Sequence, residues 1–98
     1  MKSYNEINNI LHEHLSSLRE QFSIASLGVF GSVVRDEQSP ASDVDILVDF
    51  NRPIGLVRFL QLESRLAALV GSKVDLVSRK ALKPTIGKRI LAEVRYVN

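Results

Sequence analysis

Two aspartates that stand two residues apart are the side chains in this sequence best suited to carry out chemistry. Asp43 and Asp45 open an apolar run that ends at Phe50, and this alternation predicts a β-strand. Residues two apart on a strand project to the same face, so we expect the two carboxylates to lie side by side. Neighbouring carboxylates repel each other unless a positive charge lies between them. A divalent cation such as Mg²⁺ meets this need, because it prefers oxygen ligands from one or two carboxylates together with substrate phosphates.

A Gly-Ser pair upstream of these acids predicts an anion site. Gly31 and Ser32 follow the apolar run Leu27–Phe30, which predicts a strand. Glycine adopts backbone angles that other residues avoid, and Ser32 is a good N-cap for a short helix that begins at Val33. Free backbone N–H groups at such a helix start bind phosphate. An anion site beside a metal-binding acid pair indicates chemistry on a nucleotide.

The spacing of these two features resembles a known family. Gly31-Ser32, then residues 33–42, then Asp43-Val44-Asp45 resembles the motif of the nucleotidyltransferase superfamily typified by DNA polymerase beta. The short chain and Arg35 resemble the minimal nucleotidyltransferases, the antitoxin half of HEPN/MNT toxin–antitoxin pairs. Family members often have Ala-Arg-Gly where this chain has Val34-Arg35-Asp36, so a glycine of that loop is missing here.

The resemblance also implies a third acid. Asp75 interrupts the apolar run 73–78, and acids are rare inside strands. In the resembling family an acid on a later strand completes a triad, and Asp75 is the candidate at that place. Asp43 and Asp45 would then bind two Mg²⁺ ions about 3.5–4 Å apart. Asp75 would bind the ion on the nucleophile side and orient the attacking hydroxyl.

The same resemblance implies how a nucleotide is held and what is done with it. Gly31 and Ser32 would hold the β- and γ-phosphates of ATP. Arg35 would neutralise phosphate charge or dock the acceptor, with a surface ion pair to a nearby acid as the alternative. Antitoxins of this group transfer AMP from ATP to a tyrosine of a HEPN ribonuclease toxin, which would be the partner. The competing hypothesis is a non-catalytic antitoxin that neutralises a HEPN toxin by direct binding.

Two further readings of the acids find less support in the sequence. One alternative is transfer of a nucleotide to a small molecule such as an aminoglycoside, but nothing in the sequence resembles the second, drug-binding domain that this reaction would need. A phospho-receiver domain has its acid pair at the end of the first strand, whereas this pair follows a Gly-Ser loop on the second.

Direct binding to nucleic acid has only the basic segment 79–95 in its favour, and we do not expect it. That segment contains Glu93 as its single acid, and a solvated helix face explains it equally well.

Composition limits the organisation of the chain. Its 98 residues are expected to form one domain, residues 1–98, and 45% hydrophobic content is enough for a core. The net charge is only +2, and there is no cysteine for a disulfide or a thiolate metal site. The sequence has no run of about 18 apolar residues, so we expect no membrane span and a cytoplasmic location.

Periodicity predicts an α/β (α+β) fold with a small mixed β-sheet flanked by helices, as the resemblance to the polymerase-beta-like fold also implies. Ser3 and Glu6 form a capping-box pattern at the start of the first helix. Helices are predicted at residues 3–22, 33–37, 56–70 and 84–94, and strands at residues 26–30, 43–50 and 73–78. On the helix 56–70, the predicted buried side includes Leu56, Phe59, Leu60, Leu66, Leu69 and Val70.

Overall fold

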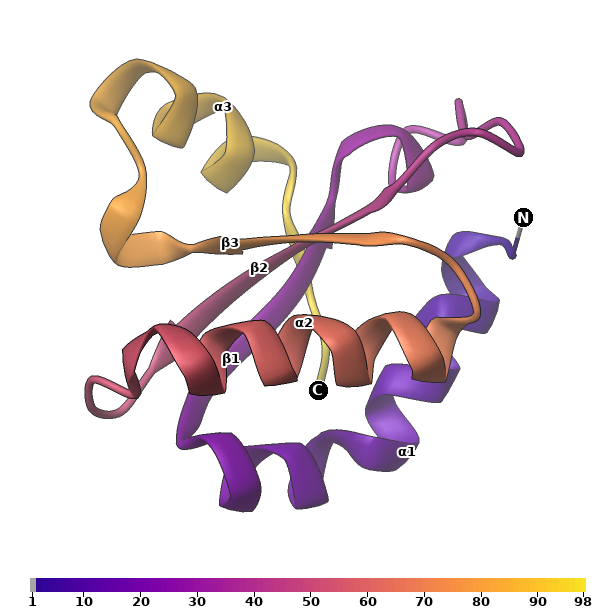
Figure 1. Cartoon of the computed structure of the whole chain (residues 1–98). Helices are drawn as coiled ribbons and strands as arrows, with labels where there is room; N and C mark the ends of the chain where they lie inside the picture. The colour runs from indigo at the N-terminus through magenta and orange to yellow at the C-terminus, as the bar shows by residue number, and fades with distance from the viewer. Residues whose placement is uncertain (1) are drawn as a thin grey trace.

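A mixed four-stranded β-sheet with the strand order β3-β2-β1-β4 is the frame of the molecule (Figure 1). The computed structural model describes residues 2–98. Along the chain the elements are α1 (Tyr4–Phe22), β1 (Ile24–Phe30), β2 (Val44–Phe50), α2 (Gly55–Val70), β3 (Val74–Ser78), α3 (Pro84–Glu93) and β4 (Arg95–Tyr96). Two short 3₁₀ helices, η1 (Gly31–Val33) and η2 (Arg79–Ala81), follow β1 and β3. The predicted α/β class with a small mixed sheet is therefore confirmed.

The pairing of the strands decides which side chains meet. β1 pairs antiparallel with β2 and β4, whereas β2 and β3 run parallel. Parallel neighbours need a crossover connection, and α2 provides it. Asp45 of β2 lies opposite Phe30 on one side and opposite Asp75 on the other. Because residues directly opposite each other share a face, the register brings Asp45 and Asp75 to the same side of the sheet.

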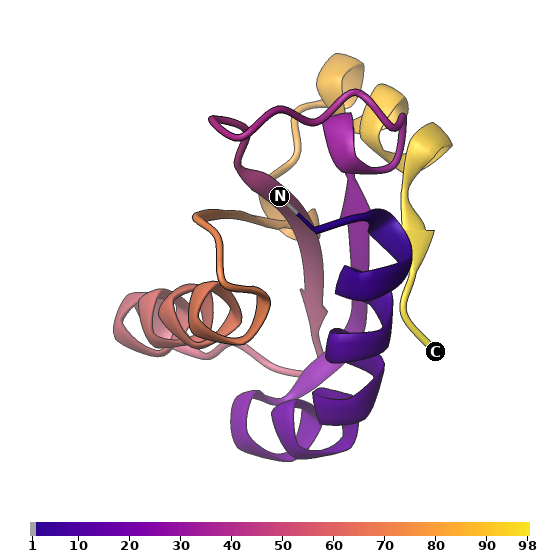
Figure 2. The same cartoon turned by 90° about the vertical axis from the view of Figure 1, so that its right-hand side faces the viewer.

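The two long helices bury the other face of the sheet. Val44, Ile46 and Val48 of β2 are fully buried on that face. α1 packs with one apolar stripe, and its Ser3–Glu6 capping box forms as expected. The helix residues buried in the core are Ile7, Leu11, Leu15, Leu18 and Phe22 of α1 with Leu62, Leu66 and Val70 of α2. Figure 2 shows α2 beside the sheet and α3 at the opposite end of the molecule.

Several local predictions were wrong. Residues 33–37 do not form a helix; η1 covers Gly31–Val33 and is followed by a turn. Phe30 takes the N-cap position, so Ser32 lies inside η1 instead of capping a helix. On the predicted side of α2, Leu66 and Val70 are buried, but Leu56 and Leu60 are 71% and 49% exposed.

The C-terminal strand β4 was not predicted at all. It is only two residues long, and the chain that follows it is anchored by the Val97 N–H, which donates to the Leu27 carbonyl at 2.8 Å. Among residues 2–98, none of the helices combines the length and the hydropathy needed to cross a lipid bilayer.

Candidate active site

Three aspartates lie at or next to the starts of β2 and β3, on the side of the sheet that α1 and α2 leave uncovered. Asp43 precedes β2, Asp45 is its second residue, and Asp75 is the second residue of the parallel neighbour β3. Burial, followed by the negative charges of Asp75 and Asp43, raises the pKa of Asp45 to about 6, although Arg35 opposes the shift. Asp45 is therefore the carboxylate at the centre of the acidic group.

Gly31 lies directly against Asp45. It has φ +80, and a Cβ built on it would come within 2.1 Å of Asp45 Oδ2. Any side chain at this position would therefore face both an unfavourable backbone conformation and a collision with the carboxylate. The Gly-Ser loop and the acid pair, which the sequence joins only by spacing, form one site in the structure.

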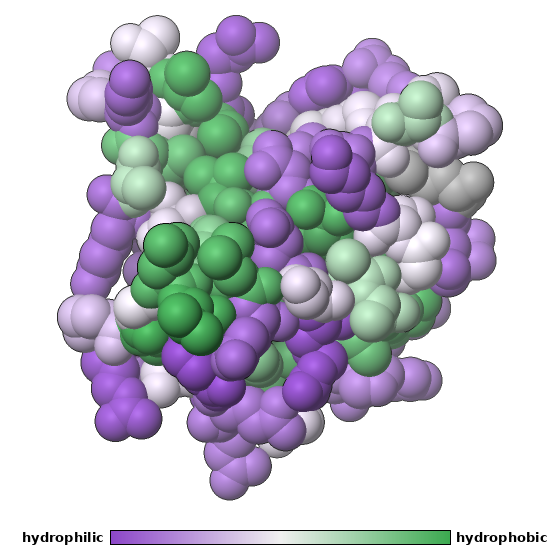
Figure 3. All heavy atoms as spheres, in the orientation of Figure 1, coloured by the Kyte–Doolittle hydropathy of each residue, from purple (hydrophilic) through white to green (hydrophobic). Residues whose placement is uncertain are grey.

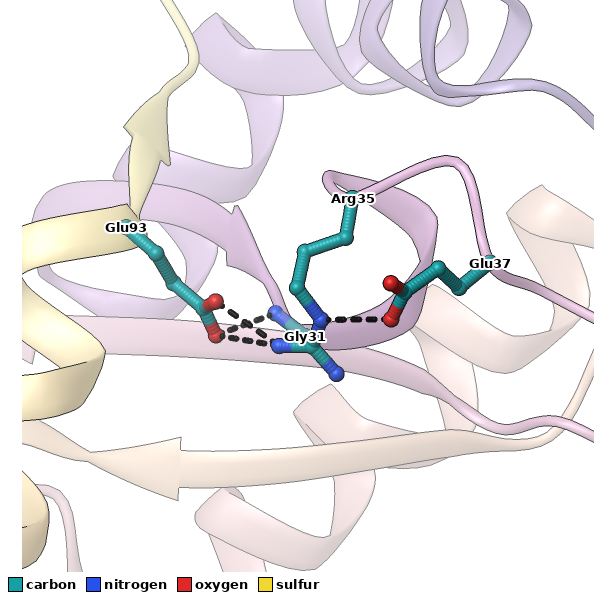
Figure 4. A network of polar contacts seen from close by, with 4 residues as sticks. All are labelled: Gly31, Arg35, Glu37 and Glu93. Carbon is teal, nitrogen blue, oxygen red and sulfur yellow. Dashed lines mark hydrogen bonds and ion pairs between the residues drawn. The ribbon is translucent and has the colours of Figure 1, made fainter.

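The carboxylate of Glu93, which was not predicted as a site residue, also reaches this loop from α3. Glu93 Oε2 accepts a hydrogen bond of 3.0 Å from the Gly31 N–H (Figure 4). Arg35 Nη1 donates to Glu93 Oε1 at 2.7 Å and to Oε2 at 3.1 Å. Arg35 Nε also donates to Glu37 at 2.9 Å. Arg35 is thus held between two carboxylates, which is the ion pair that the sequence left as its alternative.

Glu93 remains ionised in this network. Partial burial acts to raise its pKa, but the hydrogen bonds from Arg35 and from the Gly31 N–H outweigh burial and lower the pKa. The charges of Arg35 and Arg89 act in the same direction. In the sequence, Glu93 stands out only as the single acid of the basic segment 79–95. The contact of Glu93 with Gly31 depends on the fold.

The loop between η1 and β2 keeps the backbone shape that a glycine would favour. Asp36, where the resemblance led us to expect a glycine, has φ +57. Aspartate is one of the few residues with a side chain that adopt this left-handed conformation readily. The Glu37 N–H closes the turn onto the Ser32 carbonyl at 2.9 Å.

A pocket adjoins the Gly31 loop on the side of α3. It combines apolar side chains with positive charge, and it is lined by Phe30, Gly31, Arg35, Ile86, Arg89, Ile90, Ala92 and Glu93. Apolar walls with a few convergent polar groups are typical of small-molecule sites. The pocket shares Gly31 with the aspartate site but is not lined by Asp43, Asp45 or Asp75, so a ligand could extend from it toward Asp45.

The donor set suits a hard divalent cation. Asp43, Asp45 and Asp75 offer only carboxylate oxygens, which Mg²⁺ prefers. As the side chains lie in the structure, residues 2–98 contain no group of three or more His, Cys, Asp or Glu residues that could hold a metal ion. Like charges repel one another, so a cation would have to draw these side chains together. Burial makes the largest contribution to the raised pKa of Asp45, and the charges of Asp75 and Asp43 raise it further in spite of Arg35.

Comparison with known proteins gives a consistent family. Residues 11–97 match the Nucleotidyltransferase domain family. The chain is 50% identical over 97 residues to the protein adenylyltransferase MntA of Thermococcus cleftensis, an alignment that covers 99% of this chain and 98% of the relative.

Solved structures agree with the fold. A structure described as a minimal nucleotidyltransferase superposes with a TM-score of 0.78 at 33% identity, covering 92% of both chains. A toxin–antitoxin complex with AMP-PNP gives a TM-score of 0.77 at 22% identity, covering 93% of this chain and 72% of that one. A complex of a tri-AMPylated Shewanella oneidensis HEPN toxin with an MNT antitoxin gives 0.69 at 18% identity, covering 93% and 71%. The last two likenesses establish the fold alone. With the family match, the relative and the acidic site beside Gly31 taken together, the chain belongs to the nucleotidyltransferase domain family and is a nucleotidyltransferase.

Proposed function

We propose that this chain is a Mg²⁺-dependent protein adenylyltransferase that acts as an antitoxin by transferring AMP from ATP to a tyrosine hydroxyl of a HEPN toxin. The observation that carries the proposal is the register of Asp45 with Asp75 directly beside Gly31. It occurs in a chain that is half identical to a protein adenylyltransferase. The similar folds of a toxin–antitoxin complex with AMP-PNP and of an MNT antitoxin bound to an AMPylated HEPN toxin support ATP as the donor and such a toxin as the acceptor.

The proposed reaction divides the roles among the residues of the site. The acceptor oxygen attacks the α-phosphorus of ATP and loses its proton, while the bond to the β-phosphate oxygen breaks and pyrophosphate leaves. Asp75, the most exposed of the three acids, orients the attacking hydroxyl. Asp43 and Asp45, with Asp75, would hold Mg²⁺, which when bound neutralises the charge on the attacking and leaving oxygens.

The Gly31 loop and Arg35 would hold the leaving group. The backbone N–H of Gly31 and the hydroxyl of Ser32 are the proposed donors to the β- and γ-phosphates. Arg35 carries a fixed positive charge beside that loop, which suits the charge that develops on pyrophosphate. Positioning and charge neutralisation supply most of the catalysis in reactions of this kind.

Neutralisation by contact alone is the second candidate, and an exposed apolar patch favours it. Leu56, Val57 and Leu60 of α2 are 71%, 69% and 49% exposed. Figure 3 shows a green, hydrophobic area over the start of α2. Contiguous exposed apolar side chains often mark protein interfaces. A partner bound there could be inhibited without any chemistry.

Intact-mass analysis separates the two candidates. The protein that co-purifies with this chain is weighed before and after incubation with ATP and Mg²⁺. A mass gain of one or more AMP units on the partner supports adenylylation, and the double variant Asp43→Asn/Asp45→Asn should give no gain. A tight complex that gains no mass with any nucleoside triphosphate would instead favour neutralisation by contact.

A further inference from the structure

We propose that Glu93 competes with the nucleotide's β- and γ-phosphates for the Gly31 loop and so sets the affinity of the site for triphosphates. The inference rests on the proposed nucleotide binding and extends it. Glu93 lies at the end of α3, far from the Gly-Ser motif in sequence, yet its carboxylate accepts from the Gly31 N–H at 3.0 Å. In this role Glu93 is a specificity residue for the polyphosphate chain.

The carboxylate has the contacts that a phosphate oxygen would need. Its two oxygens receive one backbone N–H, from Gly31, and the guanidinium of Arg35 at 2.7 and 3.1 Å (Figure 4). Backbone N–H groups and arginine are the donors that bind phosphate in proteins. A phosphate and the Glu93 carboxylate cannot use the same Gly31 N–H and the same guanidinium edge together, so one must displace the other.

The contact is also weak enough to be displaced. The side chains of Arg35 and Glu93 are 48% and 28% exposed, so solvent screens their ion pair. Glu93 stands near Asp45 as well, where its negative charge contributes to the raised pKa of that acid. The released carboxylate can be hydrated, whereas a triphosphate brings more negative charge to Arg35 and Arg89 than one carboxylate does.

Competition of this kind has a specific signature. Nucleotides with β- and γ-phosphates must displace Glu93, whereas AMP has none and leaves the contact intact. Removing the charge of Glu93 should therefore strengthen the binding of triphosphates and leave the binding of AMP unchanged. A purely supporting role for Glu93, in which it holds Arg35 or the loop in place, gives the opposite sign for triphosphates.

Calorimetric titration of the full chain with Mg²⁺ and a non-hydrolysable ATP analogue, and separately with AMP, tests the proposal. We expect Glu93→Gln to lower the Kd of the analogue about tenfold, equivalent to about 1.4 kcal/mol, and to change the Kd of AMP less than twofold. Glu37→Gln is the matched control, because it removes the same charge from the same arginine without touching Gly31. It should change neither Kd by more than about twofold.

Two results would overturn the inference. The analogue could bind Glu93→Gln no better than wild type, or more weakly, which would make Glu93 a support. Glu37→Gln could give an equal gain, which would make the effect one of general charge. Glu93→Asp, which keeps the charge but shortens the reach to Gly31, covers the case in which Glu93→Gln does not fold, and it should also bind the analogue more tightly. Failure of every variant and of wild type to bind the analogue would reject the proposed function itself.

Discussion

Asp45 is the residue that the other residues of the site surround. It is half-buried and follows Asp43 by two positions. It lies opposite Asp75 in the sheet and directly against Gly31. Burial, followed by repulsion from Asp75 and Asp43, opposes its ionisation and raises its pKa. Burying a carboxylate beside other acids has a cost for folding, which the proposed Mg²⁺ would reduce.

The raised pKa of Asp45 predicts how stability depends on pH. Its pKa is about 6 in the folded chain, compared with about 3.9 in unfolded chains. Its contribution to stability is therefore fully present below pH 4 and is lost as the pH rises through 6. We expect Asp45→Asn, which cannot ionise, to be more stable than wild type at pH 7.5 by roughly 1–2 kcal/mol, after a discount for solvent screening.

Denaturant unfolding in EDTA at pH 4.0 and pH 7.5 measures this difference. The gain of Asp45→Asn over wild type at the higher pH should shrink at pH 4.0. Glu13→Gln, which changes an exposed acid on α1, is the control and should show no such dependence. An Asp45→Asn variant that is less stable than wild type at pH 7.5 would mean that Asp45 is stabilised as an anion.

At the scale of elements, the C-terminal segment is the part that ties the site to the fold. α3 ends at Glu93 beside the Gly31 loop, and β4 then pairs with β1 opposite Gly28. A Cβ on Gly28 would lie 2.6 Å from Val94 Cγ2, so the segment packs closely against the sheet. Val97 then enters the core with 3% of its surface exposed. The position of Glu93 therefore depends on how residues 94–97 are anchored.

Truncation of Val97 tests that anchor. We expect Val97→Ala to lower the free energy of unfolding by about 2 kcal/mol, because it removes buried methyl groups and leaves a cavity. Val57→Ala is the same substitution at a position that is 69% exposed, and it should change stability by less than about 0.5 kcal/mol. Equal effects of the two substitutions in urea unfolding would mean that the C-terminal segment is not part of the core.

The sequence predicts those elements whose signals are local. The Ser3–Glu6 capping box and the apolar period identify α1, and parity along β2 puts Asp43 and Asp45 on one face. β4 has no such signal, because two residues are too few for a period and only pairing with β1 makes them a strand.

The sequence also could not decide contacts that depend on tertiary packing. Helical spacing placed Leu66 and Val70 on the predicted side of α2, and they are buried. Leu56 and Leu60 on that side are exposed, whereas Leu62, which the spacing did not mark, is buried. Glu93 reaches Gly31 across a sequence separation of 62 residues, which no motif spans. The ion pair of Arg35 and the left-handed backbone of Asp36 likewise appear only in the folded loop.

At the scale of the whole molecule, the sheet separates the hydrophobic core from the candidate active site. One face carries the core under α1 and α2, and the other carries the acids with α3 at its edge. The net charge is +2, yet Asp43, Asp75 and Glu93 add negative charge around Asp45. The molecule as a whole should therefore gain stability when a cation and a nucleotide bind together, because they relieve repulsion that the fold alone does not.

Thermal unfolding measures this gain directly. A ligand at a hundred times its Kd adds about 2.7 kcal/mol to stability, which raises the melting temperature by on the order of 10 °C in a chain of this size. We expect a non-hydrolysable ATP analogue with Mg²⁺ to give an increase of this order, and the analogue in EDTA to give much less. The Asp43→Asn/Asp45→Asn variant should lose the part that depends on Mg²⁺, because each asparagine keeps only a neutral amide oxygen in place of the carboxylate that would hold the ion. An equal increase with and without Mg²⁺ in wild type would mean that the nucleotide binds through the Gly31 loop and Arg35 alone, and the three aspartates would then need another role.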